Sequence, residues 1–153
     1  MTPRLNLFTA SPAAMQAWLE LGKTIENDGL EPTLKDLVTM RVSQINGCAC
    51  CLHYHLADAR KHGEAEDRLH LLNAWRESAL YSARERAALG WAEALTLVSQ
   101  THAPDEAYEA LRRHFNEDEQ VKLTSLIGQI NAWNRFNIGF RSAHPADEKK
   151  KAA

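Results

Sequence analysis

Apolar residues recur at intervals of three and four along most of the chain, and this spacing predicts amphipathic helices. Between the apolar runs stand prolines and capping residues, and Gly29, Gly47 and Gly63 follow three of the expected helix ends. The predicted helices begin near Pro12, Pro32, Cys48, Ala65, Ser82, Pro104 and Asn116. Asn46-Gly47 could form a hairpin turn, but helical periodicity flanks it on both sides. We therefore predict one all-α domain of about six or seven helices.

Length and composition agree with a single globular domain. The chain has 153 residues, of which 44% are hydrophobic and 25% charged, and this is enough to bury one core. The helical pattern covers residues 10–141, and a polar tail with a run of lysines follows it. We expect one domain over residues 1–153, with its core at about 10–141 and a solvated, mobile tail at 142–153.

The charge of the chain narrows the classes of partner. The 18 basic and 20 acidic residues give a formal net charge of −2, and no basic stripe stands out. We therefore expect neither nucleic acid nor a membrane surface as a partner. The N-terminal segment lacks the apolar core of a signal peptide, and no stretch approaches the roughly 18 apolar residues of a membrane span. These features predict a soluble, cytoplasmic protein.

Three cysteines, Cys48, Cys50 and Cys51, stand within four positions, and the chain has no others. A secreted disulfide framework spreads its cysteines along the chain, so this cluster indicates redox or metal chemistry. Because a helix advances about 100° per residue, Cys48, Cys51 and His55 share one face of the predicted helix. Two thiols at this spacing can close into a disulfide, and the first turn of a helix favours a thiolate. His55 can accept the proton of Cys51 and return it to a leaving group.

Other interpretations of these residues stay open. A CxxC pair could be half of a zinc site that includes His53 or His55, but no second ligand pair at a matching spacing follows it. Cys50 points away from the shared helix face, which favours an inert, packed thiol. His53 and His62 are interpreted as surface or packing histidines rather than catalytic ones.

Three stretches of the sequence together resemble one family. They are LKDLVTMRVSQINGCACCLHYHLADARKHG, then ERAALGWAEALTLVS, and finally LIGQINAWNRFNIGFR. These stretches are similar to the AhpD-like alkylhydroperoxidases of the carboxymuconolactone decarboxylase superfamily, over about residues 10–141. The resemblance implies the all-α AhpD-like fold, assembled as a trimer or hexamer with sites near subunit contacts.

The resemblance also implies roles for particular residues. It makes Cys48 and Cys51 the redox pair and His55 the proton-relay histidine. Family members carry a glutamate twelve residues before the first cysteine, and here that position holds the shorter Asp36. Asp36 is either the relay carboxylate beside His55 or a capping acid three residues after Thr33. A second departure is Cys50, where relatives often carry an aromatic residue or a histidine.

Residues and resemblance together predict a thiol-dependent peroxidase. Its substrates would be alkyl hydroperoxides or hydrogen peroxide, and an external thiol or dithiol would return the electrons. Neither a cofactor nor a metal is implied, because the thiols themselves carry the electrons. The alternatives are a general thiol–disulfide oxidoreductase and a non-enzymatic oligomer that is redox-sensing or purely structural. A lactone decarboxylase is less consistent with the sequence, because that branch of the superfamily lacks the CxxC pair.

Overall fold

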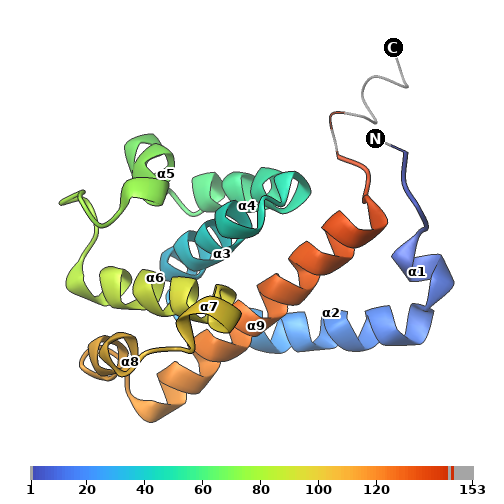
Figure 1. The fold of residues 1–153 in the computed structure, drawn as a ribbon. Coiled ribbons are helices and arrows are strands. Elements are labelled where there is room, and N and C mark those ends of the chain that lie inside the picture. The colour runs from blue at the N-terminus through green and yellow to red at the C-terminus, as the bar shows by residue number, and fades with distance from the viewer. Residues whose placement is uncertain (1, 145, 147–153) are drawn as a thin grey trace.

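The computed structural model describes residues 2–144 and 146, and these residues form helices without any strand. The helices are α1 (Leu7–Ala10), α2 (Pro12–Glu26), α3 (Pro32–Asn46), α4 (Ala49–Lys61), α5 (Glu66–Leu71), the 3-10 turn η1 (Leu72–Ala74), α6 (Ala83–Thr96), α7 (Val98–Thr101), α8 (Asp105–Arg112) and α9 (Glu117–Phe140) (Figure 1). The predicted all-α class is confirmed. Most of the tail that we expected to be mobile, at 142–153, lies outside the described residues.

The predicted number of helices was too low, because the described residues contain nine α-helices rather than six or seven. The two additional helices, α1 and α7, have four residues each. A single turn is too short to show an apolar period, so the sequence pattern could not reveal it. The helix predicted from Ala65 also differs, since it ends as α5 and continues as the 3-10 turn η1.

The turn between α3 and α4 positions the cysteines. Gly47 follows α3 with φ of 69°, in the left-handed region that glycine adopts without steric cost. The N–H groups of Gly47 and Cys48 donate to Gln44 and Ser43, which closes the end of α3. Cys48 is then the N-cap of α4, so that all three cysteines lie at the start of this helix.

The core is built around α3, which packs against α4, α6 and α9 (Figure 1). One face of α3 supplies Leu34, Val38 and Val42 to a cluster shared with α6, α8 and α9. Another face supplies Leu37 and Met40 to a second cluster with α4, α5 and η1. Because α3 is buried on two faces, the helices packed around it are held in fixed positions relative to one another.

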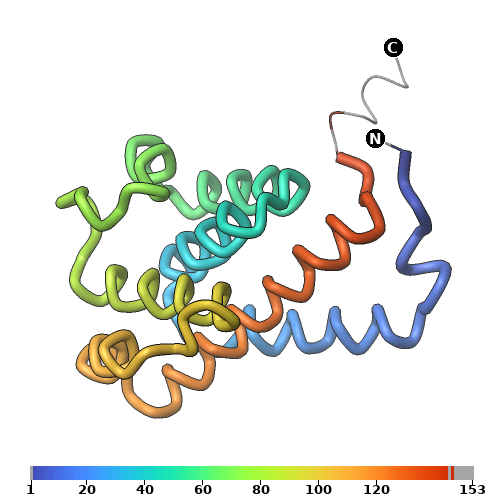
Figure 2. The backbone as a smooth tube through the Cα atoms, in the orientation of Figure 1, coloured from blue at the N-terminus to red at the C-terminus, as the bar shows by residue number. Residues whose placement is uncertain are grey.

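The two ends of the described chain meet beside α9 (Figure 2). The backbone N–H of Arg4 donates to the carbonyl of Phe140 at 2.9 Å, and its guanidinium donates to Gly139. None of the helices in the described part of the chain is long and apolar enough to cross a membrane.

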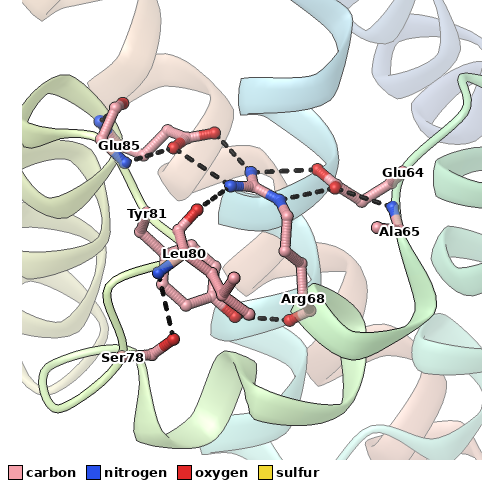
Figure 3. A network of polar contacts seen from close by, with 8 residues as sticks. Glu64, Ala65, Arg68, Ser78, Leu80, Tyr81 and Glu85 are labelled. Carbon is pink, nitrogen blue, oxygen red and sulfur yellow. Dashed lines mark hydrogen bonds and ion pairs between the residues drawn. The ribbon is translucent and has the colours of Figure 1, made fainter.

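A polar network joins α5 to the start of α6 (Figure 3). The guanidinium of Arg68 contacts the carboxylates of Glu64 and Glu85 at 2.7 and 2.5 Å, and it also donates to the carbonyl of Leu80. The hydroxyl of Tyr81 donates back to the Arg68 carbonyl. Glu85 belongs also to the capping box with Ser82, as the sequence predicts for the start of α6.

Candidate active site

Cys48 and Cys51 form a disulfide at the start of α4, with their Cα atoms 5.4 Å apart. The Cys48 sulfur also accepts a hydrogen bond from the backbone N–H of Cys51 at 3.3 Å, as an N-cap does. Cys50 stands outside this bond, and its thiol faces the carbonyl of Ala143 at 3.9 Å. The pair therefore lies at the positive end of the α4 dipole, where a thiolate is stabilised once the disulfide is reduced.

The two bonded cysteines differ in what they face. Both are buried, with exposed fractions of 1% for Cys48 and 4% for Cys51. Cys51 lines a cavity of about 790 Å³, whereas Cys48 is not among the described residues that line it. The amide nitrogen of Asn137 donates to the Cys51 sulfur at 3.3 Å. A molecule in the cavity therefore meets Cys51 first.

The cavity lies between α2, α3, α4 and α9 and has two kinds of wall. Its apolar wall comes from α2 and α9, with Trp18, Leu19, Ile25, Leu126, Ile130 and Trp133. Its polar wall comes from α3 and α4, with Asp36, Thr39, Cys51, His55, Asp58 and His62. All the sequence-predicted site residues except Cys48 thus meet in one cavity of a size typical of small-molecule sites.

His55 is half-buried on α4, one turn after Cys51. Burial lowers the pKa of its imidazole, and the negative charge of Asp58 opposes this effect. A lowered pKa favours the neutral ring at pH 7, which can accept a proton from a thiol. The geometry is therefore compatible with the predicted role of His55 as a base.

Asp36 is buried, and its carboxylate bonds to His62, which the sequence interpretation assigned to the surface or to packing. Its Oδ2 lies 2.7 Å from Nδ1 of His62, and no hydrogen bond joins it to His55 among the described residues. No side chain caps α3 either, so the capping-box role with Thr33 is not seen. Burial raises the pKa of the Asp36 carboxyl, and the hydrogen bond from His62 opposes the rise. The spacing of α4 contained the signal for His62, since it follows His55 by seven residues on the same face.

Asparagines of α9 hold the end of α3 and the start of α4. The Asn46 amide donates to the side-chain oxygens of Asn131 and Asn134 at 2.9 and 2.8 Å. Asn134, fully buried, donates in turn to Ser43 at 3.1 Å. Asn137, one turn further along α9, is the residue that reaches Cys51. These asparagines, missed at the sequence level, fix the turn that carries the cysteines.

The zinc alternative requires a group of ligating side chains in the described part of the chain. There, no three side chains of histidine, cysteine, aspartate or glutamate are grouped so as to hold a metal ion. The His53 ring packs instead against the rings of Tyr54 and His144.

Comparison with known proteins identifies the family. The sequence profile of the carboxymuconolactone decarboxylase family matches residues 12–94, which span α2 to α6 and include the cavity wall formed by α3 and α4. The chain belongs to this family. Among its relatives, the uncharacterized protein YdfG of Bacillus subtilis is 40% identical over 138 residues, covering 90% of this chain and 94% of YdfG.

Members described as AhpD proteins are also similar to this chain, and the resemblance inferred from the sequence is confirmed. A crystal structure from Agrobacterium tumefaciens, described as a protein of unknown function and a candidate antioxidant defence protein AhpD, superposes with a TM-score of 0.91. It is 45% identical, and the match covers 94% of this chain and 99% of that one. The alkyl hydroperoxide reductase AhpD of Hyphomonas neptunium is 36% identical over 62 residues, covering 40% of this chain and 32% of that protein.

Proposed function

We propose that this protein is a thiol-dependent peroxidase that reduces alkyl hydroperoxides or hydrogen peroxide through Cys48 and Cys51. The observation that carries the proposal is the position of Cys51, which lines the cavity and is bonded through its sulfur to Cys48. The similarity to AhpD proteins supports the same chemistry. The cytoplasmic location and the trimer or hexamer stay predictions.

The reaction divides into three steps. His55 takes the proton of Cys51, and the thiolate attacks one peroxide oxygen, so that an S–O bond forms and the O–O bond breaks. The sulfur becomes a sulfenic acid, and the departing alkoxide or hydroxide takes back from His55 the proton that came from Cys51. The Cys48 thiol then displaces hydroxide from this sulfur, which forms the disulfide and releases water. An external thiol or dithiol reduces the disulfide by exchange and is itself oxidised.

The burial of both sulfurs favours this function over general thiol–disulfide exchange. Exposed fractions of 1% and 4% leave little room for the disulfide of a folded protein substrate. A peroxide or a small dithiol can reach Cys51 through the cavity. We therefore expect peroxide turnover to be fast and insulin reduction to be slow.

The test is peroxide consumption by substoichiometric enzyme with a series of small dithiols. Many turnovers per enzyme molecule would support the peroxidase. Insulin reduction without peroxide turnover would instead identify the general oxidoreductase. Absence of both activities, with a disulfide that opens and closes, would favour the redox-sensing oligomer.

The apolar wall of the cavity predicts a preference for organic peroxides. Trp133 packs against Trp18 and Phe136, so its indole is held in place beside the cavity. We expect Trp133→Ala to lower kcat/KM for cumene hydroperoxide about tenfold or more, since lost apolar contact in a pocket has effects of this size. Hydrogen peroxide makes no such contact, and its kcat/KM should change much less in the same variant.

Hydrogen peroxide is thus an internal control for the folding of the variant. Trp91→Ala is a matched control, because Trp91 is also half-buried but lies outside this cavity. It should leave the ratio of the two kcat/KM values unchanged. An equal decrease in kcat/KM for both peroxides in Trp133→Ala would contradict the proposal that the apolar wall favours organic peroxides.

A further inference from the structure

The side-chain amide of Asn137 is in direct contact with the sulfur that the proposed reaction uses. Its Nδ2 lies 3.3 Å from the Cys51 sulfur, and among the described residues no other side chain donates a hydrogen bond to that atom. A disulfide sulfur carries no proton and can only accept, so the NH2 end of the amide must face it. Asn137 also lines the cavity. The donor is therefore in place at Cys51 before a peroxide arrives.

Backbone contacts hold the turn of α9 that carries Asn137. The backbone N–H of Ser142 donates to the Asn137 carbonyl at 3.0 Å, which closes the end of α9. Arg4, from the other end of the chain, donates to the carbonyls of Gly139 and Phe140. Because α9 also packs against α3 and α4, the amide is preorganised toward the start of α4.

The ionisable groups that share the cavity with Cys51 carry charges of both signs. In the described lining they come from α2, α3, α4 and the end of α4, whereas α9 contributes none. They are Lys23, Glu26, Lys35, Asp36, Tyr54, His55, Asp58, Lys61 and His62. Lysines and carboxylates oppose each other in their effect on a thiolate, and none of them makes a described hydrogen bond to the Cys51 sulfur. We therefore attribute stabilisation at the sulfur to the neutral amide in contact with it.

We propose that Asn137 stabilises the Cys51 thiolate and so raises the fraction of reactive sulfur at neutral pH. The inference rests on the proposed peroxidase function. Once an external thiol has reduced the disulfide, the S–H bond of Cys51 breaks, its proton passes to His55, and the hydrogen bond from Asn137 becomes charge-assisted. A hydrogen bond to an ionised group lowers the pKa of a thiol by about one to two units. The amide itself neither gains nor loses a proton.

The pH dependence of alkylation by iodoacetamide tests the proposal, because the thiolate is the reacting form. In a background of Cys48→Ser and Cys50→Ser, Cys51 is the only cysteine of the chain, and the midpoint of its rate profile is its pKa. Asn137→Leu removes the donor at similar side-chain volume and should raise this pKa by about one unit or more. Asn137→Asp places a carboxylate against the sulfur and should raise the pKa further. The other ionisable groups of the cavity are the same in each variant.

Asn27→Leu is the matched control for the alkylation experiment. Asn27 lines the same cavity, but its amide donates to the carbonyl of Lys23 at 2.8 Å. The substitution should leave the pKa of Cys51 unchanged. An unchanged pKa in both Asn137→Leu and Asn137→Asp would overturn the proposal. An equal rise in Asn27→Leu would also overturn it, since the polarity of the whole cavity would then set the pKa.

Peroxide turnover provides a second measurement, with Cys48 and Cys50 intact. Below both pKa values, a rise of one unit lowers the thiolate fraction tenfold, and the greater nucleophilicity of a more basic thiolate offsets part of this loss. At such a pH we expect Asn137→Leu to lower kcat/KM for hydrogen peroxide about three- to tenfold. The rates should converge where both thiols are ionised.

A decrease in kcat/KM that is equal at every pH would contradict the proposal and indicate a structural role for Asn137. Failure of the proposed function is a distinct result. The unaltered protein would then turn over no peroxide, whereas the alkylation profiles would still report the effect of Asn137 on the Cys51 thiolate.

Discussion

Cys51→Ser is expected to lower peroxide turnover by several orders of magnitude and to remove the sulfenic acid, whereas Cys48→Ser should still form a sulfenic acid at Cys51. The reason is the asymmetry of the site, because Cys51 lines the cavity and accepts a hydrogen bond from Asn137. Cys48 is 1% exposed and is not among the described residues that line the cavity. The measurement is mass mapping of a sulfenate trap after one equivalent of peroxide.

Without an external thiol, Cys48→Ser should thus consume one peroxide per molecule and then stop, since the thiol that forms the disulfide with Cys51 is missing. Cys50→Ser is the control and should keep multiple turnovers, because Cys50 is outside the disulfide. Sulfenic acid at Cys48 in the Cys51→Ser variant would reverse the two roles. Such a result would mean that the helix dipole, which acts more strongly on the earlier cysteine, outweighs access from the cavity.

The parts of the fold that the sequence predicted are those set by local physics. The capping box of α6 and the Asn116 cap of α9 depend on residues three positions apart, and both form as the sequence predicts. The end of α3 at Gly47 has the same kind of cause, a backbone angle that glycine favours. The short helices α1 and α7 show neither an apolar period nor a long buried face, so the sequence pattern could not predict them.

The sequence could predict only the part of the site that lies on one helix, α4. The shared face of Cys51 and His55 follows from helical geometry. The partner of Asp36 depends on how α3 packs against the far end of α4, and spacing within α4 alone could not choose between His55 and His62. The bond from Asn137 to Cys51 joins residues 86 positions apart, which only the tertiary packing of α9 brings together. A single sequence contains no direct signal for such a contact.

A large loss of stability is expected for Arg68→Leu, at a residue outside the cavity. Arg68 pairs with Glu64 and Glu85, and the exposed fractions of these three side chains are only 19%, 6% and 18%. Leucine would leave two partly buried carboxylates without their cation and would remove donors to the Leu80 carbonyl (Figure 3). Breaking a buried ion pair by removing one partner costs about 3 kcal/mol, which denaturant unfolding can measure.

The same network predicts how stability depends on pH. Burial raises the pKa of Glu85, but hydrogen bonds from Arg68 and Ser82 outweigh it, and the net pKa lies below the ordinary value of 4.5. A carboxyl with a depressed pKa contributes stability that is fully present above its unfolded value and is lost as the pH falls through the folded one. The unaltered protein should therefore lose stability below about pH 4.5, and this loss should be smaller in Arg68→Leu.

Arg60→Leu provides the control for Arg68→Leu, because Arg60 makes the same two-pronged contact with Glu66 but in solvent. The exposed fractions of these two side chains are 52% and 50%, and water screens such a pair. Loss of the Arg60–Glu66 pair should lower the free energy of unfolding by less than about 1 kcal/mol. The comparison therefore separates the effect of burial from the effect of geometry. An equal decrease in the free energy of unfolding in the two variants would mean that water hydrates the carboxylates beside Arg68 when the guanidinium is removed. The network would then add little to the stability of the α5–α6 connection.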